Sequence, residues 1–282
     1  MNIIPGDVAA VVLAGGVGRR FGRPKALAML DGVSLVERAV EALSSGPADV
    51  YVSVSPRLER PVSRLVGPSR VIVDLVEQAP CGGPLRAFLT SAAVLNHYST
   101  LVFMPVDAPW ASWKDLEPLY NASKAVDSGA SYFSGDGVVH PLFLVAPRNK
   151  LLHAAYTACH WRGEKRATAI LRTLDPVVLL GSSKTRNPLA LATVNTPQDL
   201  LRPSRVPVPA EGYIILEGHS TLFSISASTG DYYTALAIEA EYKLYRNLGL
   251  QRLASHALKD ASRLGLMTSL LQSVSTLGCS GC

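Results

Sequence analysis

The chain has 282 residues, 48% hydrophobic and 17% charged, which is enough to bury a substantial core as one large domain or as one domain with an appendage. The formal charge of +5 is modest, and the basic residues do not alternate with aromatic ones. This pattern argues against a nucleic-acid partner and favours a small anion as the ligand. No apolar run approaches the roughly 20 residues of a membrane span, and residues 1–7 do not resemble a secretory signal. We therefore expect a soluble, cytoplasmic protein without a membrane partner.

The first two hundred residues alternate short β-branched runs with amphipathic segments, a pattern typical of an α/β protein with a mostly parallel sheet. The first run, residues 8–13, is apolar throughout, as expected for a central strand that is covered on both faces. Further strands are predicted at residues 50–54, 70–73 and 101–104, and crossover helices at residues 35–43 and 85–95.

After Pro109 the pattern becomes mixed. It predicts a helix at residues 113–122, strands at residues 130–133 and 138–145, and a Gly-Asp-Gly turn at residues 135–137. We expect the two strands to form a hairpin at the far edge of the sheet.

Three prolines between residues 203 and 209 mark a boundary. Beyond them, residues 233–248 and 250–264 are helical in period and meet at Gly249. The predicted organisation is a domain of residues 1–204 and a C-terminal helical extension of residues 205–282. The extension would serve packing, self-association or the binding of a partner protein.

The four cysteines are too few for a disulfide scaffold in a chain of this length. Cys81 and Cys159 are isolated in the sequence and are interpreted as small apolar core residues. Cys279 and Cys282 form a Cys-Ser-Gly-Cys pair that supplies only half of a four-ligand zinc site. This pair is interpreted either as part of a dispensable tail or as a disulfide or redox pair.

The segment LAGGVGRRFGRPK, residues 13–25, directly follows the first strand, at the sheet edge where α/β folds bind ligands. Glycines let the backbone approach a triphosphate closely, and basic side chains neutralise its charge. Four basic residues lie within seven positions: Arg19, Arg20, Arg23 and Lys25. The segment therefore predicts a triphosphate-binding loop.

Two other glycine-rich motifs do not fit this loop. Gly16, Gly18 and Gly22 are spaced one residue too widely for the dinucleotide-binding fingerprint, and four basic residues suit a triphosphate better than a dinucleotide pyrophosphate. The chain also lacks the Gly-x-x-x-x-Gly-Lys-Ser/Thr sequence of P-loop proteins.

The pattern Leu-Ala-Gly-Gly-x-x-x-Arg-Phe-Gly-x-x-Lys resembles the signature loop of the MobA-like nucleotidyltransferases, the molybdenum cofactor guanylyltransferase family. The resemblance covers about residues 8–201. It implies a Rossmann-like, three-layer, mostly parallel sheet of the nucleotide-diphospho-sugar transferase type, with the helical extension outside it. It also implies catalytic roles for Arg20 and Lys25, and nucleotide contacts by the following loop residues: Leu13, Ala14, Gly15, Gly16, Arg20 and Lys25.

Two carboxylates follow later strands. Asp74, which precedes a Gly-Pro-Leu segment at residues 83–85, resembles the family residue that contacts guanine, although a strand-end residue capping a turn is the alternative interpretation. Asp107, in Asp-Ala-Pro, resembles the family's metal site and would be a catalytic, nucleotide-binding Mg²⁺ ligand. The alternative for Asp107 is an N-cap of the helix after Ser112.

Three further stretches resemble the family: His140-Pro141, Gly163-Glu164-Lys165-Arg166 and Val194 to Leu200. They imply four acceptor-binding residues: His140, Lys165, Arg166 and Asn195. A lone histidine is also common scaffolding, and Asn195 before Thr-Pro is also a turn initiator. The chain departs from the family in having only Gly22 after Arg-Phe, in a loop one residue shorter, and in Ser53-Val54-Ser55 where asparagines are common.

The resemblance implies that the protein transfers GMP from Mg²⁺-bound GTP to a phosphorylated pterin-type acceptor, most simply molybdopterin, with release of pyrophosphate. Two alternatives keep the site and change the role. One is a transferase that uses CTP or another phosphorylated acceptor, such as a cobamide or a sugar phosphate. The other is a non-catalytic nucleotide sensor or assembly partner, against which the presence of Arg20, Lys25 and Asp107 argues.

Overall fold

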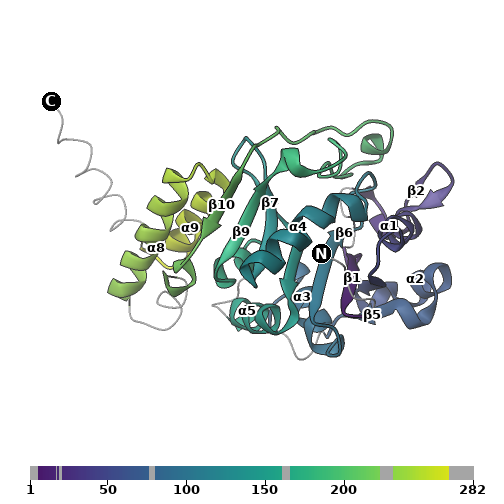
Figure 1. The fold of residues 1–282 in the computed structure, drawn as a ribbon, viewed down its shortest axis with the longest axis horizontal. Helices are drawn as coiled ribbons and strands as arrows, with labels where there is room; N and C mark the ends of the chain where they lie inside the picture. Colours follow the sequence, from purple (N-terminus) through teal and green to yellow (C-terminus); the bar gives the residue numbers. More distant parts are fainter. Residues whose placement is uncertain are drawn as a thin grey trace.

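The computed structural model describes residues 6–16, 18, 21–75, 80–160, 166–222 and 231–266. An eight-stranded sheet crosses the molecule, with helices on both of its faces (Figure 1). Its strands are β1 (Val8–Leu13), β4 (Asp49–Val54), β5 (Val71–Val73), β6 (Thr100–Pro105), β7 (Gly129–Phe133), β8 (Val139–Pro147), β9 (Val177–Gly181) and β10 (Tyr213–Leu216). A separate two-stranded ribbon joins β2 (Met29–Leu30) to β3 (Val33–Ser34).

The α-helices named here are α1 (Leu35–Ser44), α2 (Glu59–Val66), α3 (Pro84–Val94), α4 (Trp113–Val126), α5 (Arg148–His160), α6 (Ala169–Thr173), α8 (Asp231–Asn247) and α9 (Gln251–Arg263). No helix within the described ranges is both long and apolar enough to cross a membrane.

The sheet has the order β10-β9-β7-β8-β6-β1-β4-β5. β1 pairs in parallel with β4 and β6, and β4 pairs in parallel with β5, so these four strands end at one edge of the sheet. β8 runs antiparallel between β6 and β7, while β9 is parallel to β7. The fold is therefore the mostly parallel, three-layer α/β architecture that the sequence predicts.

The apolar run of β1 is buried on both faces of the sheet, as predicted from its lack of alternation. Val12 packs in one core cluster with Leu35 of α1 and Leu116 of α4. Its neighbour Val11 points to the opposite face and packs in a second cluster with Phe88 of α3. Each such fully buried aliphatic side chain stabilises the fold by roughly 1.5–3 kcal/mol through the area that it removes from water.

Asp107 is not the N-cap of α4, the helix that follows it. Ser112 is the N-cap of α4, and its backbone N–H and hydroxyl both donate to the carboxylate of Asp115, at 2.9 and 2.8 Å. This reciprocal capping box satisfies the first turn of the helix. The N-cap interpretation of Asp107 is therefore wrong, and its carboxylate is left for other partners.

The hairpin predicted around residues 130–145 is present, but its predicted place at the sheet edge is wrong. β8 lies between β6 and β7, and β9 and β10 extend the sheet beyond β7. These two strands are short, and neither was recognised in the sequence. Local pattern alone cannot show that residues 213–216, which follow the proline-rich segment, return to pair with residues 177–180.

The two predicted C-terminal helices are present as α8 and α9, and Figure 1 shows them beside β10 at the end of the sheet. Tyr245, Leu250 and Leu253 belong to the same buried cluster as α3 and α5, so the extension contributes to the core of the sheet's second face. A domain boundary near residue 204 stays a prediction, and Cys279 and Cys282 lie outside the described residues.

Buried charges also connect the extension to the rest of the fold. The Arg172 guanidinium of α6 is 1% exposed and donates to both carboxylate oxygens of Glu241, at 2.5 and 2.6 Å, and to Asp260 at 2.6 Å. Burial disfavours its charge, but the two acids outweigh that effect and hold the pKa of Arg172 above its usual value. One buried arginine therefore links α6 to both α8 and α9.

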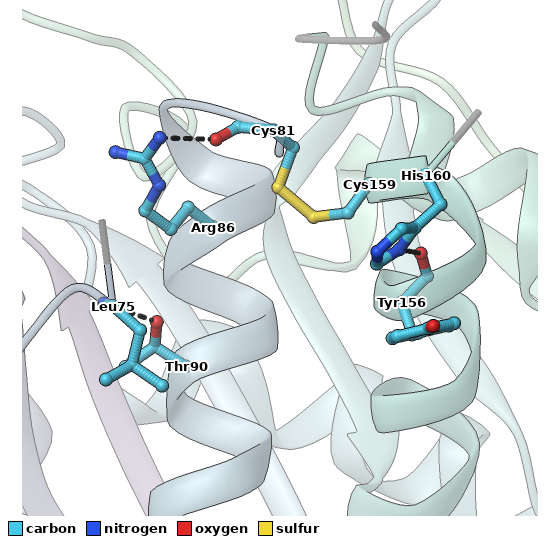
Figure 2. The surroundings of a disulfide bond; sticks show 7 residues. All are labelled: Leu75, Cys81, Arg86, Thr90, Tyr156, Cys159 and His160. Atoms are coloured by element: carbon cyan, nitrogen blue, oxygen red, sulfur yellow. Dashed lines mark hydrogen bonds between the residues drawn. A yellow bond between two sulfur atoms is a disulfide. The ribbon is translucent and has the colours of Figure 1, made fainter. Parts of the chain in front are cut away.

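The interpretation of Cys81 and Cys159 as separate apolar residues is wrong, because they form a disulfide (Figure 2). Cys81 lies just before α3 and Cys159 near the end of α5; their Cα atoms are 4.7 Å apart although 78 residues separate them in sequence. Both are buried, which explains why burial was expected correctly and pairing was missed. Their proximity arises only when α3 and α5 pack side by side.

Candidate functional site

The loops that follow β1, β4, β5 and β6 surround a pocket of about 450 Å³, here called the first pocket. Its wall is completed by the first turn of α3, by Leu142 of β8 and by Asn195. The predicted nucleotide-binding residues that line it are Leu13, Gly15, Gly16, Lys25, Asp74 and Asp107. Ala14 is fully buried between the loop and the core, and Arg20 lies outside the described residues.

The glycine-rich loop folds back on itself at Gly18. This residue has a φ of +62°, and a Cβ atom on it would lie 2.0 Å from the carbonyl oxygen of Arg23. The N–H of Phe21 donates to the Gly18 carbonyl at 2.8 Å, which closes the turn. Only glycine combines this backbone conformation with such a close approach, and the turn returns the chain to Lys25 at the pocket.

Lys25 and Asp107 both line the first pocket and form an ion pair there. The Lys25 ammonium donates to Asp107 Oδ2 at 2.6 Å and to Asn195 Oδ1 at 3.0 Å. The side chains of Lys25 and Asp107 are only 17% and 19% exposed, so this ion pair is screened less than a surface pair would be. The structure thus brings together three predicted site residues that lie 82 and 170 positions apart in sequence.

Asp74 stands at the end of β5 on the opposite side of the glycine loop. The Ser53 hydroxyl donates to its Oδ1 at 2.7 Å, and a Cβ atom on Gly15 would lie 3.3 Å from its Oδ2. Burial raises the pKa of Asp74 to about 6, against the lowering effects of Ser53 and Arg86. Ser53, one of the departures from the family pattern, therefore fixes the orientation of this carboxylate.

The sequence interpretation missed Arg86, which projects from the first turns of α3 into the first pocket. Its guanidinium donates to the Cys81 carbonyl at 2.5 Å (Figure 2), and its buried Nε has no hydrogen-bond partner within the described part of the chain. Its position directly after the Gly-Pro-Leu segment is the signal that could have identified it. Arg86 thus adds a cationic side chain to the wall of the first pocket.

A second pocket of about 650 Å³ adjoins the first. Both pockets are lined by five residues at their junction: Pro84, Pro105, Asp107, Leu142 and Asn195. The rest of the second pocket comes from the β7–β8 turn, from β8, from residues 166–168 and 191–207, and from α9. Its basic and imidazole side chains are His140, Arg166, Arg205, Arg252 and His256.

His140, a predicted acceptor-binding residue, lines the second pocket near the start of β8. Its Nε2 lies 3.2 Å from the Ser134 hydroxyl, which itself donates to Asp136 at 2.6 Å. Burial, and after it the nearby Arg252, lower the pKa of His140 to about 4, whereas Asp136 opposes the shift. The imidazole is therefore neutral at pH 7 and can act only as a hydrogen-bonding group.

Arg166, another predicted acceptor-binding residue, also lines the second pocket and is held by α9. Its guanidinium donates to the His256 carbonyl at 3.3 Å and pairs with Asp260. His256 in turn lies with Nδ1 2.7 Å from the Thr168 hydroxyl. Lys165, the fourth predicted acceptor residue, lies outside the described residues.

The backbone of Asn195, whose side-chain amide contacts Lys25, is held by the buried carboxylate of Asp199. The sequence interpretation did not single out Asp199. Asp199 accepts from the backbone N–H groups of Asn195, Thr196 and Ser204, at 2.7, 2.8 and 3.1 Å. These hydrogen bonds, that of Ser204 first, hold the pKa of Asp199 well below its usual range. The turn after Asn195 is thus organised by Asp199, and the Asn195 side chain points to the junction of the pockets.

The side-chain oxygens of Asp107 and Asn195 at the junction are suitable ligands for a hard cation. Asp107 and Asn195 each direct one oxygen at the Lys25 ammonium, so the spot between them already accommodates positive charge. Mg²⁺ commonly binds through one or two carboxylates together with phosphate oxygens and water. Within the described residues no three His, Cys, Asp or Glu side chains gather into a complete metal site, so substrate oxygens would have to complete the coordination.

A parallel sheet edge with a cationic glycine turn, an isolated carboxylate and a deep pocket defines an α/β nucleotide-binding protein. Residues 10–177 match the model of the MobA-like NTP transferase domain, and the chain belongs to this family. The family predicted from the loop motif is therefore confirmed.

Similar proteins agree with this assignment. A molybdenum cofactor guanylyltransferase from Sinorhizobium fredii is 31% identical over 144 residues, which cover 50% of this chain and 64% of that protein. A probable molybdenum cofactor guanylyltransferase from Bacillus cereus (strain AH187) is 28% identical over 69% of this chain and 94% of its own. The first of these matches thus spans less than two thirds of the relative's length.

Two solved structures share the fold. Molybdopterin-guanine dinucleotide biosynthesis protein A from Archaeoglobus fulgidus has a TM-score of 0.55 and 25% sequence identity, over 69% of this chain and 95% of that one. A nucleotidyl transferase from Methanothermobacter has a TM-score of 0.52 at 19% identity, over 69% of this chain and 94% of its own, and supports the architecture alone.

Proposed function

We propose that this protein transfers GMP from GTP to the phosphate of a molybdopterin-type acceptor and releases pyrophosphate. The observation that carries the proposal is the junction at which Lys25, Asp107 and Asn195 meet, 2.6 and 3.0 Å apart, between two adjoining pockets. A transferase needs two substrates to touch at one point, and this junction is the point that both pockets share.

The reaction balances without a covalent enzyme intermediate. An oxygen of the acceptor phosphate forms a bond to the α-phosphorus of GTP, while the bond from that phosphorus to the bridging oxygen breaks and pyrophosphate leaves with the electron pair. Mg²⁺, when bound at Asp107, supplies positive charge that stabilises the leaving group. The protein's own contribution is to position both substrates and to neutralise their charge.

Each side chain has a proposed task. The backbone of Gly15 and Gly16 approaches the triphosphate, and Lys25 turns from Asp107 to the phosphate oxygens when nucleotide binds. Arg20, in the same loop, adds charge to this side. His140, Lys165 and Arg166 contact the acceptor, and these assignments rest on the family resemblance together with the pocket that His140 and Arg166 line.

The choice of guanine rests on Asp74. With a pKa of about 6, this side chain is mostly ionised at pH 7 and is then only an acceptor of hydrogen bonds. Guanine presents two N–H donors on its Watson–Crick edge, whereas cytosine presents one amino group beside acceptors. An ionised carboxylate therefore favours GTP over CTP at this place.

The test is turnover by the purified full chain with Mg²⁺, molybdopterin and each of the four NTPs in separate reactions. We expect pyrophosphate and a pterin–guanine dinucleotide with GTP, and little product with the others. Thermal-shift titration with the same nucleotides reports binding independently, since a selective ligand stabilises the folded state by mass action. Product formation from CTP instead, or nucleotide binding without pyrophosphate release, would contradict the proposal.

A further inference from the structure

Helix α9 reaches the second pocket because it is seated on the β7–β8 turn. Gly137 of that turn has a φ of +72°, and a Cβ atom on it would lie 2.4 Å from the Gly249 carbonyl oxygen and 3.0 Å from the N of Gln251. The backbone N–H of Arg252 donates to the Gly137 carbonyl at 3.3 Å. This close backbone contact sets the first turn of α9, with Arg252, at the rim of the pocket.

The cations of the second pocket differ in their partners. Arg166 pairs with Asp260, and Arg205 pairs with Asp136. The guanidinium of Arg252 forms neither an ion pair nor a side-chain hydrogen bond with any of the described residues. It is thus the pocket arginine whose charge is not balanced by an acid in this part of the chain.

The imidazoles nearby respond to that charge. Arg252 contributes to lowering the pKa of both His140 and His256, each to about 4, although burial is the largest cause for both. Because both rings are neutral at pH 7, they add hydrogen-bonding capacity without repelling a cation or attracting an anion. The positive charge by which the second pocket would attract an anion therefore comes from its arginines.

We propose that Arg252 of the C-terminal extension binds a second anionic group of the acceptor, remote from the phosphate that reacts. The identity of the ligand as the acceptor rests on the proposed function. Arg252 lies outside residues 10–177, which match the family model, so this contact belongs to the extension that distinguishes this chain from the family domain.

The position of the junction explains why the anionic group at Arg252 cannot be the phosphate that reacts. The reacting phosphate must reach the α-phosphorus held in the first pocket, and the residues lining both pockets there include Asp107 and Asn195. Arg252 lines the second pocket only. A ligand that fills this pocket thus meets the junction, where the Lys25 ammonium contacts Asp107 and Asn195, and meets Arg252 elsewhere. An acceptor with anionic groups at separate positions matches both cations.

The experiment compares the wild-type chain with R252Q and with K259Q. Lys259 is exposed on the same helix and lines neither pocket, so K259Q removes an equal charge without removing the proposed contact. Inorganic phosphate is titrated calorimetrically against each protein with the first pocket saturated by Mg²⁺-GTP. We expect R252Q to weaken phosphate binding about tenfold, as loss of a charge-assisted hydrogen bond does, and K259Q to change it less than twofold.

A turnover arm then measures KM for molybdopterin, which should rise about tenfold in R252Q while the affinity for GTP stays unchanged. Equal phosphate binding by wild type and R252Q, or an equal loss in K259Q, would overturn the assignment. If GTP does not bind or no transfer occurs, the proposed function fails; the phosphate titration, repeated without nucleotide, still compares wild type with R252Q. Equal unfolding temperatures of the three proteins exclude a folding defect.

Discussion

The two pockets are built by different means. The first is formed by backbone turns at the ends of parallel strands, with Gly18 in one turn and the ion pair of Lys25 with Asp107 at its wall. The second is formed by side chains from distant elements, and arginines dominate its charge. This difference teaches that the first pocket, proposed to bind the nucleotide, depends on the sheet itself. The second pocket, proposed to bind the acceptor, depends on how α9 is attached and can vary without altering the first.

The largest effect is expected from breaking that attachment. Replacement of Arg172 by Met removes the buried cation that Glu241 and Asp260 share, and Asp260 keeps only Arg166 and Arg263 among its described partners. This change should lower the free energy of unfolding by about 3–5 kcal/mol. Chemical denaturation measures this loss, and GTP affinity should stay near the wild-type value because the first pocket does not use the extension.

Lys243→Met is the matched control for Arg172→Met. It breaks the pair of Lys243 with Glu239, in which the lysine side chain is 43% exposed, and should cost less than about 1 kcal/mol. Similar losses in the two variants would show that the buried charges of Arg172 do not anchor the extension. A parallel loss of GTP affinity in Arg172→Met would show that the two pockets are not independent.

The next largest effect is on turnover, which should depend on a carboxylate of the junction far more than on a carboxylate of the second pocket alone. Asp107→Asn keeps the shape of the junction but weakens its hold on Lys25 and on Mg²⁺, so turnover should fall by roughly 10²–10³-fold. Steady-state pyrophosphate release measures the loss. Asp136→Asn removes a carboxylate that lines the second pocket alone, and its turnover should change only a few-fold. Wild-type turnover in Asp107→Asn would remove the metal assignment.

The smallest effect is a pH dependence of the first pocket. In the proposed complex the ionised form of Asp74 accepts from guanine. Its pKa of about 6 means that its ionised fraction falls as the pH is lowered from 7 to 5. GTP affinity, measured by calorimetry, should therefore fall about tenfold over this range. In Asp74→Asn the affinity should be weaker at pH 7 and should lose this pH dependence.

The stability of the nucleotide-free protein should respond to Asp74 in the opposite direction. The folded pKa, about 6, lies above the ordinary value of 3.8, so this side chain stabilises the fold below pH 3.8 and that contribution is lost as the pH rises through 6. Comparison of Asp74→Asn with the wild type across this range isolates the effect from other groups. A GTP affinity that is flat with pH in the wild type would contradict the role of Asp74.

The sequence predicted the parts of the molecule that short segments encode. The strand β1, the glycine loop after it and the carboxylates Asp74 and Asp107 at strand ends all follow from local pattern, because parallel strands deliver their C-terminal residues to one edge. The place of the hairpin could not be predicted in this way, since it depends on whether β9 and β10 return to the sheet.

The missed site residues fall into two groups. Arg252 and His256 enter the second pocket through the packing of α9, and Asp199 acts through backbone groups of its neighbours. No motif marks Arg252 or His256, because their role arises from contacts between elements far apart in the chain. Asp199 lies inside a stretch that resembles the family, and Arg86 lies within one turn of another, so these two had a local signal.

The disulfide gives the molecule a dependence on its redox surroundings. Cys81 lies two residues before Gly83, which lines the first pocket, and Cys159 lies at the end of α5, so the crosslink fastens the rim of that pocket to a helix contributed by a later part of the chain (Figure 2). A covalent loop of this length restricts the unfolded chain and typically stabilises a protein by about 2–4 kcal/mol. Thiol reductants and the glutathione potential of the surroundings thus govern how long the first pocket survives heat or denaturant.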